Sequence, residues 1–273
     1  QDFISSSVPG MTSVMRYGGD IDVVRRFLAA GFPVVAEKGY YERDYAGKIG
    51  WMGHYQFITG YDDGRQELIV QDTYNDGPNF HISYDKFIEG WRSFNYLFVV
   101  VYPSTKERDV MSLLGPLSDE YAAASHAMQV AEEETRSLVG IDRFFAWFNL
   151  GTSHVARQEY VDAAAAFDNA FQLYAGLGGN DTTRPYRMMW YQTGPYWAYY
   201  YSARYADVIN LADTTLKDTI ASPDLEESLL WRGRAYYMAG KTQDALDDYR
   251  AALKIHPNWD PAMQALKDLG YQQ

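Results

Sequence analysis

Apolar and polar residues alternate over short stretches in about the first hundred residues, a pattern typical of β-strands. Two stretches with helical spacing interrupt this alternation, residues 21–30 after the N-cap residue Asp20 and residues 84–94 after Ser83. The predicted order is therefore β-α-β-β-β-α-β, an α+β domain with a mainly antiparallel sheet. The strands are expected at residues 11–17, 33–37, 54–61, 67–73 and 96–102.

After residue 118 the pattern changes to paired helices, most clearly in residues 231–257. There Gly233 and Ala245 place small side chains where two antiparallel helices would touch, while Tyr236 and Tyr249 fill the space around them. We therefore expect a helix pair that depends on these small residues for its close approach.

The same spacing recurs earlier in the chain. Gly151 and Ala163 occupy the positions of Gly233 and Ala245, and a degenerate copy, with a first helix that begins near Trp190, lies between them. These three copies resemble tetratricopeptide repeats, which stack into an all-α scaffold with a concave surface that binds other chains. The alternative is a generic helical bundle.

The hairpin predicted for residues 54–73 contains one pair of side chains suited to acid–base chemistry. If its turn centres on Asp63, with Gly64 in a left-handed conformation, His54 and Asp72 become direct neighbours across the strands. A carboxylate beside an imidazole fixes the tautomer of the ring and stabilises its protonated form, as in a nucleophilic triad. The alternative is a surface His–Asp pair without a chemical role.

The residues around this pair resemble the C-terminal half of a papain-like cysteine peptidase domain. The similar family is typified by the peptidases that process bacteriocin leaders and by their C39-like relatives. A C39-like domain followed by tetratricopeptide repeats also resembles the arrangement in certain bacterial proteins. The resemblance implies that His54 is the general base and that Asp72 orients it. It covers roughly residues 11–103 and is carried by residues 29–35, 51–55, 59–63, 71–74, 82–87 and Trp91.

The family's nucleophile is a cysteine on an N-terminal helix, preceded by a glutamine of the oxyanion hole, and this chain has no cysteine. Gln1 is too close to the start for such a helix, and nothing marks Ser5, Ser6 or Ser7 as substitutes. We therefore expect no peptide hydrolysis from this chain. Either it is a repeat scaffold with a C39-like half-domain that binds a peptide or protein, or it is the larger part of a cysteine peptidase. Since the chain starts with Gln1 rather than Met, we expect that a Cys-bearing lobe lies upstream.

The change of pattern also predicts the domain organisation. We expect a C39-like half-domain at residues 1–103, a linker at 104–117 and a tetratricopeptide-repeat domain at 118–273. The parts on either side of the linker are expected to have separate hydrophobic cores.

Aromatic residues are more frequent in the middle copy than the repeat requires. They cannot all face one way on their helices, so we expect that some belong to the core and others line a groove for a peptide. The candidate binding residues are Trp190, Tyr191, Tyr196, Trp197 and Tyr200.

The formal net charge of −12 argues against nucleic acids and anionic membranes as partners. No apolar run approaches the ~20 residues of a membrane span. The histidines lack the spacing of metal ligands and no phosphate-binding glycine motif occurs, so neither a metal nor a cofactor is expected. The partner class expected is a peptide or protein, and no oligomeric state is implied.

Overall fold

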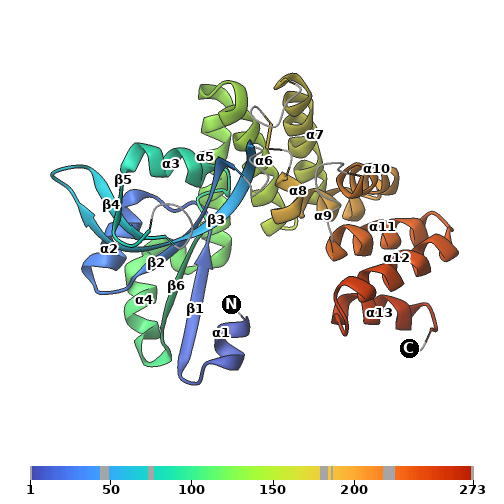
Figure 1. Ribbon diagram of the computed structural model, residues 1–273, viewed down its shortest axis with the longest axis horizontal. Coiled ribbons are helices and arrows are strands. Elements are labelled where there is room, and N and C mark those ends of the chain that lie inside the picture. The colour runs from blue at the N-terminus through green and yellow to red at the C-terminus, as the bar shows by residue number, and fades with distance from the viewer. Residues whose placement is uncertain are drawn as a thin grey trace. The chain divides into compact units, whose positions relative to one another are not determined.

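The computed structural model of the chain describes residues 2–43, 49–72, 77–178, 184–185, 187–217 and 225–271 (Figure 1). It forms two compact units. The first comprises Gln1–Gln158 and Ala166–Tyr186, and the second comprises Glu159–Ala165 and Arg187–Gln273. Helix α7, Tyr160–Gly176, therefore contributes residues to both units.

The first unit contains an antiparallel sheet, to which the described residues contribute six strands in the order β1-β6-β2-β3-β4-β5. This arrangement confirms the predicted fold class of the N-terminal part. The four-residue strand β5 was not predicted, because so short a strand carries almost no alternating pattern. The strands are β1 Met11–Arg16, β2 Val34–Arg43, β3 Ile49–Asp62, β4 Glu67–Gln71, β5 Phe80–Ser83 and β6 Phe98–Pro103.

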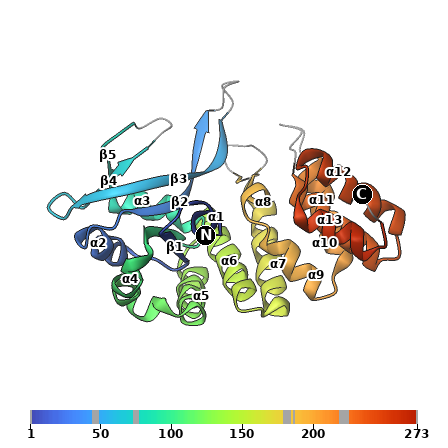
Figure 2. The ribbon, with the colours of Figure 1, turned by 90° about the horizontal axis from the view of Figure 1, so that it is seen from below.

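Helices cover one face of this sheet, and Figure 2 shows α2, α4 and α5 lying along it. Asp20 caps α2 and Ser83 caps α3 as predicted, since each side chain accepts a hydrogen bond from a backbone N–H of the first turn. The helices of this part are α1 Asp2–Ser7, α2 Ile21–Ala29, α3 Tyr84–Arg92, α4 Glu107–Leu114, α5 Glu120–Ser137 and α6 Gly140–Ala156, with 3₁₀ turns at Ser104–Lys106 and Gly115–Ser118.

The expected linker at 104–117 is not a linker in the structure, and the expectation of separate cores on either side of it is wrong. Val110 and Leu114 of α4 are fully buried in the same hydrophobic cluster as Phe98 of the sheet, and Ala123 of α5 belongs to that cluster too. The apolar sheet face needs these helices as cover, which joins segments that the sequence pattern separates. The predicted end of the C39-like half-domain at residue 103 and the predicted start of the repeat domain at residue 118 stay predictions.

Polar contacts also connect the sheet region to α5 and α6. The Arg92 guanidinium lies 3.0 Å from Glu134 of α5 and 3.0 Å from Asp142 of α6. Asn95 Nδ2 donates to Ser153 Oγ over 3.0 Å in a buried position. Because such buried groups need their partners, they fix these helices against the sheet region.

The second unit consists of helices, which confirms the predicted helical character of this part of the chain. The first helix of the middle copy is broken into α8 and α9, where we predicted one helix, because Pro195 in the first turn of α9 starts a new helix. Its described helices are α8 Met188–Tyr191, α9 Gly194–Tyr201, α10 Tyr205–Leu216, α11 Glu226–Met238, α12 Thr242–Ile255 and α13 Asp260–Asp268.

The two best copies of the repeat pack in the same way. A Cβ atom on Gly233 would lie 2.6 Å from the ring of Tyr249, and one on Gly151 would lie 2.6 Å from the ring of Phe167. Both glycines therefore mark positions where an aromatic ring of the next helix lies on the backbone, as the sequence predicted. Among the residues that the structure describes, no helix combines the length and the apolar character needed to cross a membrane.

Candidate functional site

His54 on β3 and Asp72, directly after β4, lie side by side. His54 Nε2 is 3.0 Å from Asp72 Oδ1, in a part-buried contact. The adjacency predicted from the sequence is therefore observed, while the catalytic role of the two residues stays a prediction. Because a carboxylate can only accept, Nε2 donates this hydrogen bond, and Nδ1 is then the basic atom of the ring.

The predicted register of this hairpin is wrong by two residues. Ile58 pairs with Val70 rather than with Leu68, and a bulge at Thr59 follows. Side chains alternate with a period of two along a strand, so a shift by two residues keeps each side chain on its predicted face. His54 and Asp72 therefore meet as diagonal neighbours instead of direct ones.

The turn explains the shift. Asp62 pairs with Glu67, so the turn occupies residues 63–66 and is one residue longer than predicted. Its left-handed residue is Gln66, with φ 57°, and not Gly64 as predicted. Next to the turn the register is displaced by three residues, since Asp62 would face Gly64 in the predicted register, and the bulge at Thr59 reduces this displacement to two.

Gln56 is a third member of this site, and the sequence analysis missed it. Its Nε2 donates to Asp72 Oδ2 over 2.7 Å, and its side chain is only 1% exposed. Asp72 thus has one oxygen bonded to His54 and the other to Gln56. Gln56 lies two residues after His54 in the sequence and therefore on the same face of the strand. This spacing is the signal by which the sequence analysis could have found it.

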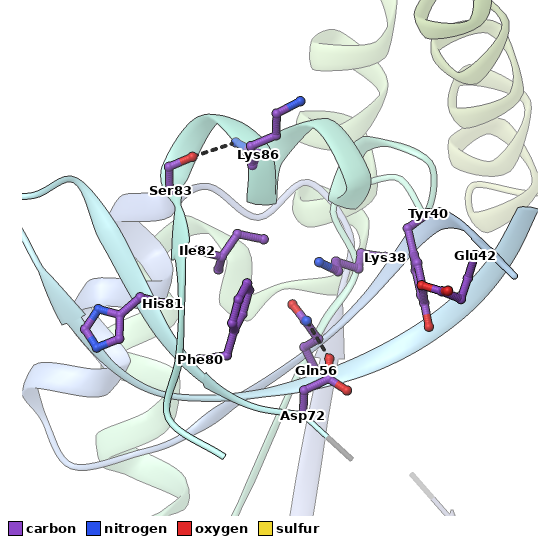
Figure 3. A pocket seen from close by; sticks show the side chains of 10 residues that line it. All are labelled: Lys38, Tyr40, Glu42, Gln56, Asp72, Phe80, His81, Ile82, Ser83 and Lys86. Atoms are coloured by element: carbon purple, nitrogen blue, oxygen red, sulfur yellow. Dashed lines mark hydrogen bonds between the residues drawn. The ribbon is translucent and has the colours of Figure 1, made fainter. Parts of the chain in front are cut away.

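A pocket of about 390 Å³ lies next to these residues (Figure 3). Asp72 and Gln56 contribute to its wall, and the ring of Tyr40, also in the wall, lies 5.7 Å from the His54 ring. A ligand in the pocket would therefore lie beside the His54–Asp72 pair. The pocket is lined by Lys38, Tyr40, Glu42, Gln56, Asp72, Phe80, His81, Ile82, Ser83 and Lys86.

A separate titratable group lies on β2, one residue before Lys38 and so on the other face of the strand. Burial raises the pKa of the Glu37 carboxyl to about 7, and a hydrogen bond from Tyr55 partly opposes this rise. Burial, with the Glu37 charge as a lesser cause, also raises the pKa of the Tyr17 phenol. Glu37 is therefore a carboxyl group that can stay protonated in the folded chain at mildly acidic pH.

The aromatic residues predicted to bind a ligand divide into two groups. Tyr196 is fully buried, and its hydroxyl donates to Ser228 Oγ over 3.0 Å, so its prediction as a binding residue is corrected to a packing residue. Tyr191 and Trp197 are 39% and 38% exposed. Trp190 and Tyr200 are half-buried.

Trp197 belongs to a group of aromatic rings in contact with one another that we call the aromatic cluster, defined as Tyr160, Trp197, Tyr200, Tyr201, Tyr205 and Trp231. Its most exposed ring, Tyr201 at 51%, was not among the predicted binding residues. Trp231 is the buried member of the cluster, with an exposed fraction of only 2%, and its ring lies 4.9 Å from that of Trp197. The cluster joins residues from four helices, α7, α9, α10 and α11, which no single stretch of sequence indicates.

Comparison with known protein families identifies two regions of the chain. Residues 5–99 match the Peptidase_C39 like family, and residues 226–259 match the tetratricopeptide repeat. A comparison with curated protein sequences gave no match. The first region contains strands β1 to β5 with His54, Gln56 and Asp72, and the second contains α11 and α12. The chain therefore combines a Peptidase_C39-like domain with a tetratricopeptide repeat.

Proposed function

We propose that the chain is an interaction protein whose helical second unit binds a peptide or a segment of another protein. The observation that supports this function best is the aromatic cluster. Trp197 and Tyr201 are exposed large aromatic residues, and aromatic side chains of this kind dominate the binding energy of protein interfaces.

The ring contacts within the cluster prepare it for binding. Tyr201 stacks on Tyr160 with ring centroids 4.7 Å apart and an interplanar angle of 29°, and Trp197 lies 5.7 Å from Tyr201. Rings that are already held by neighbours lose little conformational entropy when a ligand arrives. Tetratricopeptide repeats in general mediate contacts between proteins, which agrees with this use of the second unit.

Selection of random peptides on the full chain tests this function. Peptides that bind the chain should bind the double variant Trp197→Ala, Tyr201→Ala at least about tenfold more weakly, because hot-spot aromatics contribute 2 kcal/mol or more. Tyr237→Ala is the matched control, since Tyr237 is also about half exposed, at 47%, and lies in the same unit outside the cluster. Selected peptides that bind wild type and double variant equally well would contradict the proposal.

A second candidate function rests on the His54–Asp72 pair. The 3.0 Å contact provides a base and the group that orients it, so the chain can be the larger part of a papain-like cysteine peptidase. Its nucleophile would then come from outside the present sequence, which has no cysteine.

The test of this candidate uses a protein extended by the upstream coding sequence. Hydrolysis of fluorescently labelled casein should appear in the extended protein, be absent from the present chain, and fall about 10²–10⁴-fold in the extended His54→Ala variant. An extended protein that does not cleave, or one whose activity survives His54→Ala, would exclude this function.

A further inference from the structure

A second pocket, of about 540 Å³, lies between α6 and α7 in the first unit, and we call it the α6–α7 pocket. The two helices run antiparallel, since the ring of Phe144 early in α6 contacts that of Tyr174 late in α7, whereas Phe148 contacts Phe167. The wall includes Gly140, Arg143, Trp147, Asn169, Gln172 and Leu173. The pocket therefore lies where the start of α6 meets the end of α7.

Arg143 is the only charged residue among the described residues of this wall. Within the described part of the chain, no ion pair and no hydrogen bond connects its guanidinium group to another residue. Arg92 and Arg232, which are also partly buried, each contact two carboxylates. Since a partly buried charge is normally paired, the charge of Arg143 is available to a ligand.

The guanidinium group of Arg143 can be reached from the pocket. Of its three nitrogen atoms, only Nε is inaccessible to solvent. Nη1 and Nη2 are therefore free to donate two parallel hydrogen bonds, which is the arrangement in which arginine binds the two oxygens of a carboxylate.

The surroundings of the pocket leave this charge uncompensated. The nearest acids in the sequence, Asp142 and Asp168, do not belong to the wall. Asp142 lies 3.0 Å from Arg92 and lines a different pocket. The helix dipoles at the start of α6 and at the end of α7 have opposite signs and offset each other. Arg143 therefore sets the charge of the α6–α7 pocket, and the group that it favours is an anion.

The rest of the wall indicates what carries the anion. The half-buried ring of Trp147 packs against Ala131, Leu150 and Ala166, and Leu173 adds a half-buried aliphatic surface from α7. A phosphate dianion would keep one charge that a single arginine does not neutralise, and an ammonium group would be repelled. The wall therefore matches one carboxylate attached to an apolar group.

We propose that the α6–α7 pocket binds a peptide carboxylate next to an apolar group, with Arg143 Nη1 and Nη2 donating to its two oxygens and the apolar group packing on Trp147 and Leu173. The carboxylate can belong to the C-terminus of the peptide or to an acidic side chain, since both present the same planar group. The pocket lies outside the two regions matched to known families, residues 5–99 and 226–259. The proposal does not depend on the aromatic cluster, which belongs to the second unit.

The test is an NMR titration of the ¹⁵N-labelled full chain with three acetylated dipeptides. The first is alanyl-phenylalanine with a free C-terminal carboxylate, the second is its C-terminal amide, and the third is glutamyl-phenylalanine amide. We expect at least one of the two acids to bind about tenfold more tightly than the neutral amide, because only an acid can form the charge-assisted pair. General electrostatic attraction cannot produce this order, since the chain has a formal net charge of −12.

Two side-chain resonances report binding at this pocket. Arg143 Nε is inaccessible to solvent, so its proton should exchange slowly and give an observable signal. This signal and that of the Trp147 indole N–H should shift when an acid binds. The acid that binds more tightly identifies whether the pocket takes a chain end or an acidic side chain.

Variants of Arg143 complete the test. Arg143→Met should lower the affinity for the acids to that for the neutral amide, and its melting temperature should stay close to that of wild type because the side chain has no partner to lose. Arg136→Met is the matched control, since it removes the same charge from an exposed site of the same unit, outside the pocket. If Arg143→Met fails to fold, Arg143→Lys should still bind the acids more weakly than wild type, because lysine lacks the paired donors.

Equal affinity of the wild type for both acids and for the neutral amide would overturn the proposal, as would undiminished binding of the acids by Arg143→Met. Shifts of the Trp197 indole N–H without shifts of Arg143 and Trp147 would locate binding at the aromatic cluster. That result would support the function proposed for the second unit and refute the carboxylate site, so the two ideas fail separately.

Discussion

Replacement of Arg232 by leucine should lower the free energy of unfolding of the second unit by about 3–5 kcal/mol, because it leaves a buried carboxylate without its partner. Arg232 contacts Asp248 through two parallel hydrogen bonds of 2.8 and 2.6 Å and contacts Asp213 through a third of 2.7 Å. Asp248 is only 6% exposed. Burial raises the pKa of Asp248, and the Arg232 charge opposes this rise, so the loss of Arg232 removes the group that favours the carboxylate.

Urea unfolding followed by tryptophan fluorescence measures this effect. Arg250→Leu is the matched control, since Arg250 pairs with Asp247 at 3.7 Å on the surface of the same repeat and should cost less than about 1 kcal/mol. The double variant Arg232→Leu, Asp248→Leu should recover much of the loss, because it removes both charges. A loss no larger than that of Arg250→Leu would show that the buried pair contributes little.

Glu37→Gln should stabilise the first unit at pH 8 and have little effect at pH 4. Burial raises the pKa of Glu37 from 4.5 to about 7, so the folded chain holds a proton that the unfolded chain releases within this range. The wild type should therefore lose stability as the pH rises from about 4.5 to about 7, by at most about 3 kcal/mol. Glutamine stays neutral and can still accept from Tyr55, so the variant should lack this loss.

Melting temperatures of both proteins between pH 4 and pH 8 test this expectation, and the difference should appear as several degrees at the alkaline end. Tyr55→Phe gives an independent check. It removes the hydrogen bond that lowers the Glu37 pKa and should move the pH range of the loss upward. Identical pH profiles for wild type and Glu37→Gln would mean that the pKa of Glu37 is the same in the folded and the unfolded chain.

The repeats could be predicted from sequence because their packing is local. Gly233 contacts a ring on the next helix of the chain, so the spacing of small and aromatic residues carries the whole signal. The break between α8 and α9 shows the limit of this signal, since Pro195 begins a new helix without disturbing the aromatic spacing.

The candidate site could be predicted only in part. The period of two placed His54 and Asp72 on one face even though the register was wrong. The Gln56 contact and the pocket depend on β2, β5 and α3, which are separate in sequence and meet only through folding. The same reason explains the false linker, because α4 is identified as a core helix only once the sheet face it covers is known.

The hairpin between β3 and β4 has a consequence for changes in its length. The turn at residues 63–66 and the bulge at Thr59 both lie between His54 and Asp72 in the sequence, whereas the pairing of Phe57 with Gln71 holds these two residues in register. Deleting a single residue from positions 63–66 would leave a three-residue turn, a common length for hairpins, so Asp62 would stay opposite Glu67 and His54 beside Asp72. Changes of one residue at the turn or at the bulge are therefore absorbed where they occur, so natural or engineered variation in the length of this hairpin is compatible with the His54–Asp72 contact.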